Sequence, residues 1–208
     1  MTLKYWVDSF VGPGGIWMWL ILVFGLIPAI ALVLERFYYL YMKCSWGRGR
    51  FMQDLTKFIK VGDFPKAIRF AADFRTPLAK VVEAILVNKD KGGSEVEKSV
   101  DEVFLTETPR IQRYIPMLGT IANISTLLGL LGTIIGLIMA FDAVANVPAA
   151  QRAQALATGI SVAMATTAFG LIIAIPLLLL HGIYLSQSEK IIEEMDEKSA
   201  KLVNILVK

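Results

Sequence analysis

The sequence predicts an all-α protein that crosses a membrane three times. Of its 208 residues, 55% are hydrophobic, and the mean hydropathy is +0.58. The apolar residues gather in three long uncharged runs, and no segment alternates apolar and polar residues over the length of a strand. A spanning helix needs about 20 apolar residues to cross a bilayer core of about 30 Å. We therefore expect three transmembrane helices, extended by helices outside the membrane.

The three uncharged runs set the expected boundaries. They cover residues 16–34, 114–141 and 153–188, and the last run contains His181. The expected parts of the chain are an outer amphipathic segment over 1–15, transmembrane helices over 16–41, 114–141 and 153–185, a helical cytoplasmic domain over 42–113, a periplasmic loop over 142–152 and a cytoplasmic C-terminal helix over 186–208.

The distribution of basic residues predicts the orientation of the chain. Residues 42–115 hold fourteen Lys and Arg and ten Asp and Glu, whereas 1–16 hold one Lys and 142–155 one Arg. Because Lys and Arg concentrate on the cytoplasmic side of membrane proteins, we expect the N-terminus to face out and the C-terminus to lie in the cytoplasm. The net charge of +3 gives no reason to expect a nucleic-acid partner.

The cytoplasmic region has clear helix breaks, at Gly62-Asp63, Thr76-Pro77 and Gly92-Gly93. After the last break, Ser94 and Glu97 have the spacing of a capping box that opens a helix. Prolines are expected to bend the helices that contain them. These are Pro28 in the first span, Pro109 and Pro116 where a helix enters the second span, and Pro176 in the third span.

No catalytic motif is visible in a sequence with one His and one Cys. We therefore expect no enzyme activity, no cofactor and no metal site. The glycines of the second span cannot cradle a nucleotide inside a membrane. Small residues in lipid instead let helix backbones approach closely. The glycines expected to serve this packing are Gly129, Gly132 and Gly136 in the second span and Gly170 in the third.

Threonines near the middle of these spans admit two interpretations. Thr133 and Thr167, with Thr166 beside it, can bond their own helix backbones, or they can face a polar path across the membrane. The second and third spans contain no Asp, Glu, Lys or Arg. Since an ion path normally needs an ionisable group at depth, a conducting protein of this kind must obtain its carboxylate from a partner chain or from a rim. His181, Asp142 and Glu35 are expected to be interface or rim residues.

At these residues the sequence resembles the MotA/TolQ/ExbB proton-channel family, and it is closest to ExbB and TolQ. Residues 127–137 resemble the second-span signature of the family, and residues 159–176 resemble its third-span signature. The segments 62–68 and 34–36 are also similar to ExbB and TolQ. Three spans with the N-terminus outside is the ExbB/TolQ layout, because MotA has four spans.

The resemblance implies a bacterial inner-membrane motor. In this family five copies form a homopentameric ring, and an ExbD- or TolR-like single-span protein inside it supplies a membrane Asp that carries the proton. By motif position, Thr133 and Thr167 match the pore threonines that face this Asp. A TonB- or TolA-like protein is a further expected partner, and lipid surrounds the ring.

The resemblance favours an ExbB-like subunit for TonB-dependent import. TolQ-like and gliding-motor subunits share the same motifs, and a passive membrane scaffold remains an alternative of another class. One departure concerns Val162, which stands where many ExbB sequences carry Glu. Without that Glu, the ring supplies no acid of its own at this depth.

Overall fold

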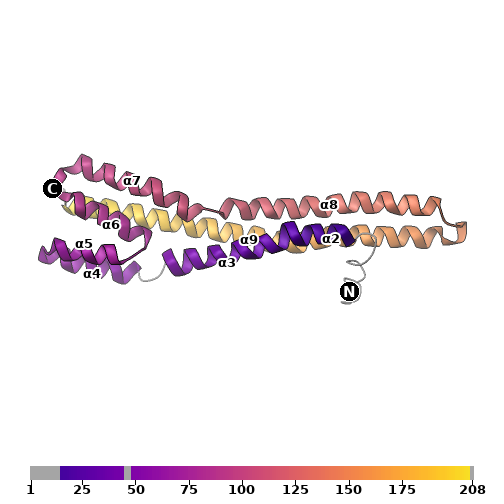
Figure 1. Cartoon of the computed structure of the whole chain (residues 1–208), viewed down its shortest axis with the longest axis horizontal. Coiled ribbons are helices and arrows are strands. Elements are labelled where there is room, and N and C mark those ends of the chain that lie inside the picture. Colours follow the sequence, from indigo (N-terminus) through magenta and orange to yellow (C-terminus); the bar gives the residue numbers. More distant parts are fainter. Residues whose placement is uncertain (1–14, 45–47, 207–208) are drawn as a thin grey trace. The chain divides into compact units, whose positions relative to one another are not determined.

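The computed structural model describes residues 15–44 and 48–206. Within these ranges every regular element is helical and no strand is present, so the all-α prediction is confirmed. Figure 1 shows the helices with the labels used below. The expected amphipathic segment over 1–15 lies outside the described residues except for Gly15, as do residues 207–208. Contacts divide the chain into two compact units. The first comprises residues up to Leu34 with Tyr114–Gly182, and the second comprises Glu35–Arg113 with Ile183 onward.

In the part of the chain that the structure describes, three helical stretches are long and apolar enough to cross a membrane. They are Gly15–Cys44, the part of Gly93–Ala145 formed by α8 (Ile115–Ala145), and the part of Ala149–Leu206 formed by α9 (Arg152–Leu206). The 55 residues of α9 far exceed the roughly 20 that one crossing needs. The three-span prediction is therefore confirmed in length and composition. The short 3₁₀ helix η4 (Ala149–Gln151) joins α8 to α9.

The first span consists of four successive helical segments. They are α2 (Gly15–Ile21), the π-helical η1 (Leu22–Leu26), α3 (Ile27–Phe37) and the π-helical η2 (Tyr38–Cys44). Pro28 has no N–H to donate, and its ring crowds the carbonyl of Phe24 four residues earlier. The N–H of Ile27 bonds to the carbonyl of Leu22, five residues back, which widens the helix just before the proline. The π-helical turn therefore accommodates Pro28.

The sequence predicts a bend at Pro116, whereas the structure has a break between two helices there. Helix α7 (Gly93–Gln112) ends before Arg113, Tyr114 adopts a left-handed backbone with φ 64°, and Pro116 lies in the first turn of α8. A helix running through Pro116 would press its ring against the carbonyl of Gln112, four residues earlier. Gln112 is the last residue of α7, so the prediction of one continuous bent helix was wrong. Pro109 lies inside α7.

The capping box predicted at Ser94 was also wrong. Helix α7 begins at Gly93, and its N-cap is Gly92, which makes no side-chain capping bond. The carbonyl of Gly92 instead accepts the N–H groups of Glu95 and Val96, at 3.2 Å each. Gly92 has φ 94°, which a residue with a Cβ rarely adopts, so the glycine pair decides where this helix starts.

The other predicted breaks in the second unit are confirmed. They separate α4 (Arg48–Val61), α5 (Phe64–Asp73) and α6 (Pro77–Asn88), which the 3₁₀ helix η3 (Lys89–Lys91) follows. Helix α4 ends in a Schellman motif: Gly62, with φ 79°, donates to Ile59, and Asp63 donates to Phe58, both at 3.1 Å. Thr76 caps α6 by accepting the N–H of Ala79 at 3.3 Å.

An apolar core holds these short helices together. Four pairs of phenylalanine rings have centroids 5.0–5.6 Å apart. The rings belong to Phe51 and Phe58 of α4, Phe70 of α5 and Phe74, the residue after α5. Each aromatic pair contributes about 0.5–1.5 kcal/mol beyond its buried area. The inward face of α6 adds fully buried aliphatic residues, among them Val81, Val82 and Ile85. Helix α6 packs against both α5 and α7.

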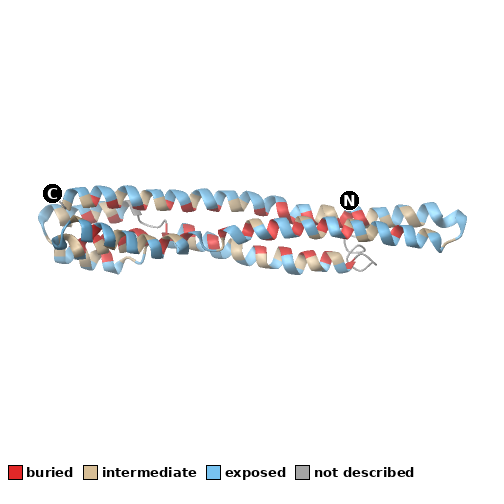
Figure 2. Ribbon diagram, turned by 90° about the horizontal axis from the view of Figure 1, so that it is seen from above, coloured by how far each residue is buried: buried red, intermediate tan, exposed pale blue. Residues whose placement is uncertain are grey.

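The long helices of the first unit bury narrow stripes and leave large apolar side chains outside. Figure 2 shows buried positions alternating with exposed ones along the helices. Exposed apolar residues on α8 and α9 include Leu130, Ile134, Ile138, Ile172 and Leu179. In water such surfaces would be unusual, whereas lipid or further subunits accommodate them.

Asp63 provides a pH-dependent test of the fold of the second unit. Its carboxylate caps α5 through the N–H of Lys66 at 3.3 Å and pairs with the Lys66 ammonium at 2.6 Å. The hydrogen bond from Lys66 lowers the pKa of Asp63 below its ordinary value. A lowered folded-state pKa contributes stability that is present above the unfolded pKa of about 3.9 and is lost as the pH falls through the folded value.

We expect Asp63→Ala to lower the melting temperature at pH 7, measured by circular dichroism in detergent. The difference from the unsubstituted protein should shrink below about pH 4, because both proteins then lack the carboxylate. Asp63→Asn should keep part of the stability, since an amide oxygen can still cap the helix. A difference that stays constant down to about pH 3 would contradict the assignment.

Candidate functional site

Helices α8 and α9 lie side by side and run in opposite directions (Figure 1). They approach each other closely at Gly129 and Gly170, where a Cβ on Gly170 would lie 2.6 Å from the carbonyl oxygen of Ser125 and 3.2 Å from the Cα of Gly129. Real Cβ atoms essentially never come this close to backbone. Only glycine therefore allows the two backbones to meet here.

The contact continues along both helices through small residues. A Cβ on Gly136 would lie 2.8 Å from the Cβ of Ala163, and one on Gly159 would overlap Ala140. A Cβ on Gly132 would lie 2.7 Å from the hydroxyl of Thr166. The expected packing glycines thus lie on the faces of α8 and α9 that touch. The first span joins them at Gly25, where a Cβ would overlap the hydroxyl of Ser125.

The glycine contact brings two threonine hydroxyls of α9 to one carbonyl of α8. The hydroxyl of Thr167 donates to the Gly129 carbonyl at 3.0 Å. The hydroxyl of Thr166 lies 2.7 Å from the Ala163 carbonyl in its own helix and 3.4 Å from that of Gly129. A donating hydroxyl keeps its oxygen lone pairs, so these groups can still accept a hydrogen bond.

Thr133 is placed differently from the two α9 threonines. Its hydroxyl donates to the Leu130 carbonyl of its own helix at 2.6 Å, and its side chain is partly exposed. Thr167 lies level with Gly129, and Thr133 is four residues further along α8, or about 6 Å along the helix axis. The two threonines are therefore within about one helical turn of each other, although no hydrogen bond joins them.

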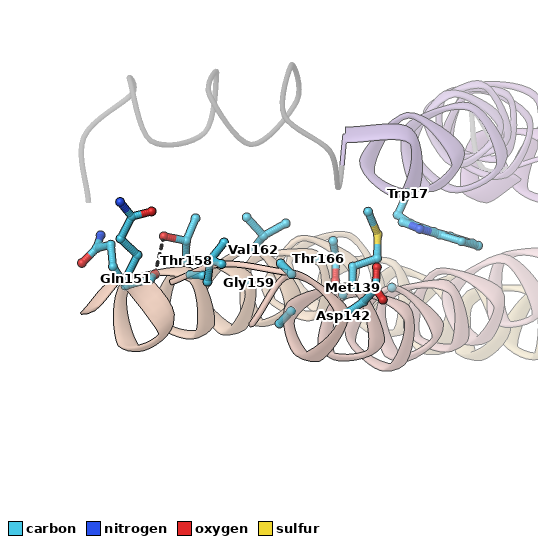
Figure 3. A pocket seen from close by; sticks show the side chains of 15 residues that line it. Trp17, Met139, Asp142, Gln151, Thr158, Gly159, Val162 and Thr166 are labelled. Carbon is cyan, nitrogen blue, oxygen red and sulfur yellow. Dashed lines mark hydrogen bonds between the residues drawn. The ribbon is translucent and has the colours of Figure 1, made fainter. Parts of the chain in front are cut away.

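A cavity of about 710 Å³ lies between α2, α8 and α9. Thr166 lines this cavity, but Thr133 and Thr167 do not. Figure 3 shows Thr158 and Val162 projecting from α9 to the same side, with Trp17 of α2 also at the cavity. Met139 and Asp142 of α8 complete this part of the wall.

Sequence reasoning missed a stripe of α9 that lines this cavity and consists of three polar residues and one valine. Gln154, Thr158, Val162 and Thr166 follow one another at four-residue intervals on α9, and all four line the cavity. Residues four apart share a helix face, so the sequence already showed three polar positions on one face of an apolar span. The sequence could not predict that these residues line a cavity, because that depends on which face of α9 turns away from lipid.

Asp142 is the one carboxylate among the described residues that line the cavity. The sequence predicts a rim residue here, and its side chain is exposed near the end of α8. The position of Val162 in the same wall means that a chain with Glu at that position would direct a second carboxylate toward this cavity. His181 packs against α8, where its Nε2 would lie 3.4 Å from a Cβ on Gly119. Pro176 lies within α9, which remains helical through it.

Comparison with known proteins places the chain in a family. The sequence profile of the MotA/TolQ/ExbB proton channel family matches residues 72–197, more than half of the chain, including all of α8 and the glycine and threonine contact. The chain therefore belongs to the MotA/TolQ/ExbB proton channel family.

The relatives include proteins named after both ExbB and TolQ. The chain is 31% identical over 170 residues to a biopolymer transport protein ExbB homolog of Methanothermobacter thermautotrophicus, covering 81% of this chain and 59% of that protein. It is 29% identical over 159 residues to an ExbB-like protein of Synechocystis sp., covering 76% of this chain and 75% of that protein. It is 30% identical over 106 residues to the Tol-Pal system protein TolQ of Pseudomonas aeruginosa, covering 51% of this chain and 46% of TolQ.

The helix contact can be tested with two glycines of α9. Gly170→Ala should destabilise the protein by about 1–3 kcal/mol, because the new methyl group meets the backbone of Ser125, which cannot rotate away. Gly182→Ala is the matched control, since no atom lies within 4 Å of its added Cβ. Alanine favours helix over glycine by about 1 kcal/mol, so the control should be neutral or stabilising.

Thermal unfolding of both variants in the same detergent measures this difference. Equal melting temperatures for Gly170→Ala and Gly182→Ala would mean that α8 and α9 do not approach each other at Gly170.

Proposed function

We propose that this chain is the channel subunit of an inner-membrane motor that uses the proton gradient to do work through an ExbD- or TolR-like partner. The observation that carries the proposal is the group of three threonine hydroxyls around the contact of α8 and α9, in two spans without Asp, Glu, Lys or Arg. Such spans offer hydrogen-bonding oxygens at depth but no titrating group. Membership of the proton channel family supports this assignment.

The proton carrier in this proposal is an Asp of the partner's single membrane span. When protonated, that Asp donates to a threonine hydroxyl, whose lone pairs remain available although its hydrogen is bonded to a backbone carbonyl. When ionised, the Asp needs a polar neighbour, because a bare carboxylate in hydrocarbon is costly. One charge that crosses a potential of 100 mV releases about 2.3 kcal/mol, and this energy drives the motion of ring and partner.

In the proposed assembly five copies surround the partner, with the N-terminus in the periplasm and the C-terminus in the cytoplasm. The fourteen Lys and Arg of residues 42–115 support this orientation. The exposed apolar faces of α8 and α9 supply the surface that neighbouring copies and lipid would cover. Thr133 and Thr167 face the partner, whereas the cavity lined by Thr166 lies on the side of α2.

We favour an ExbB-like role, in which a TonB-like protein carries the work to the outer membrane. Two relatives that match over more than three quarters of this chain are named after ExbB. A TolQ-like role, with a TolA-like protein, is the close alternative, supported by the similarity to TolQ of Pseudomonas aeruginosa over half of the chain. Gliding-motor subunits share the same motifs.

A passive membrane scaffold is a second candidate of a different class. The hydroxyls of Thr133, Thr166 and Thr167 all bond to backbone carbonyls, which is what threonines with only a structural role do. A scaffold needs these contacts for assembly and needs no proton. The two candidates therefore differ in the effect of removing a hydroxyl from an assembled complex.

Thr133→Val and Thr167→Val should each abolish proton-driven output in the assembled complex, because valine keeps the volume of threonine and removes its hydroxyl. The measurement is proton uptake by proteoliposomes that contain this chain and its single-span partner, with a pH-sensitive dye inside. We expect at least about a hundredfold loss, in the range found when a proton-transfer group is removed. Thr133→Ser and Thr167→Ser should retain flux because they keep the hydroxyl.

Thr120→Val is the control. Thr120 is also on α8 and also bonds its own helix, through the Pro116 carbonyl at 3.2 Å, but it lies on the opposite face from Thr133. Size-exclusion chromatography with light scattering checks that every variant assembles. Normal flux in both valine variants would exclude the proposed role of the hydroxyls and leave the scaffold.

A further inference from the structure

The second unit contains a cavity of about 240 Å³ whose wall is rich in positive charge. Six basic and two acidic residues line it, together with Tyr39. The basic residues are Arg36 and Lys43 from the first helical stretch, Arg75 just before α6, Lys80 in the first turns of α6, Arg110 in the last turn of α7 and Arg113 just after it; the acidic residues are Glu35 and Glu107.

The two carboxylates are engaged within the wall. Glu107 is buried, and its Oε1 accepts from the Lys80 ammonium at 2.8 Å and the Arg110 guanidinium at 2.7 Å. Glu35 pairs with Arg36. The lining holds more basic than acidic side chains, and such a local charge distribution favours anions.

Arg36 holds the wall in place. Its side chain is 2% exposed, and its Nη1 donates to the carbonyls of Arg110 and Ile111, both at 3.3 Å. These carbonyls belong to the last turn of α7, where a helix lacks partners for its carbonyl groups and favours a cation. Arg36 therefore ties the first helical stretch to α7, and the basic groups around it have a defined position.

Four basic side chains of the wall are exposed: Lys43, Arg75, Arg110 and Arg113, of which Arg110 pairs with Glu107. Lys43 lies over the ring of Tyr39, 5.4 Å from its centroid, a contact that leaves its charge in place. Guanidinium groups such as that of Arg75 can bind a phosphate through two parallel hydrogen bonds. The exposed part of the wall thus carries the groups that recognise phosphate.

The cavity lies where two uncharged runs end. Glu35 directly follows the run 16–34, and Arg113 directly precedes the run 114–141. A membrane that contains these runs has its lipid headgroups at this level. Basic pockets beside membrane helices on the cytoplasmic side bind the phosphate groups of anionic lipids. At about 240 Å³ the cavity is smaller than the roughly 300 Å³ at which pockets for drug-sized ligands begin, and it suits a single headgroup.

We propose that this cavity binds the phosphate headgroup of an anionic phospholipid, with Lys43, Arg75 and Arg113 as the contacting residues. The site does not depend on the proton path, because none of its residues belongs to the threonine contact. A lipid held here would restrain the first helical stretch, the start of α6 and the end of α7 together.

The test measures the melting temperature of the full-length protein in a non-ionic detergent during titration with dioctanoyl phosphatidylglycerol. Dioctanoyl phosphatidylcholine and inorganic phosphate are titrated in parallel. We expect stabilisation by phosphatidylglycerol alone. Arg75→Gln and Lys43→Gln should each raise the half-saturating lipid concentration about fivefold, the effect of one basic residue near an anionic headgroup.

Arg69→Gln is the matched control, because Arg69 is also an exposed arginine of this unit but does not line the cavity. It should leave the titration unchanged. Equal stabilisation by phosphatidylcholine, or by inorganic phosphate, would overturn the proposal. An equal weakening by Arg69→Gln and Arg75→Gln would overturn it as well, since it would show attraction by general surface charge.

Discussion

The first unit depends on the close approach of two helix backbones in an apolar solvent. Apolar side chains gain nothing by leaving lipid for each other, so helices in a membrane associate through van der Waals contact and hydrogen bonds. At Gly129 and Gly170 the absence of side chains lets the backbones touch. That contact brings the Gly129 carbonyl within 3.0 Å of the Thr167 hydroxyl. The glycine contact is therefore the cause of both the helix packing and the hydrogen bond of Thr167.

The second unit follows the rules of a water-soluble helical domain. Its short helices bury one apolar face each, and caps and a Schellman motif satisfy their ends at Gly62, Asp63 and Thr76. Arg36 follows the uncharged run of the first span and is a charged residue that is nevertheless buried. Its charge is buried, yet it is paired with Glu35 and bonded to carbonyls of α7, so burial leaves no unsatisfied charge.

Residues acting through local chemistry were the easiest to interpret from sequence. The uncharged runs predicted three spans, and Gly62 and Thr76 marked helix ends, because these effects depend on neighbours along the chain. The errors at Ser94 and Pro116 are also local. The N-cap of α7 is Gly92 and not Ser94, because the positive φ of Gly92 changes the direction of the chain before the helix. The ring of Pro116 ends the previous helix at Gln112, four residues earlier, rather than bending it.

By itself the sequence determined the helical class, the three spans, the small-residue faces and the lack of charge in the second and third spans. All of these follow from composition and periodicity. Only the tertiary structure decided that Thr166 and Thr167 share the Gly129 carbonyl, that Val162 and Asp142 line one cavity, and that six basic residues line another together with Glu107. The physical reason is register: which residues meet across two helices depends on the rotation and axial position of each helix, and residues far apart in the chain set both.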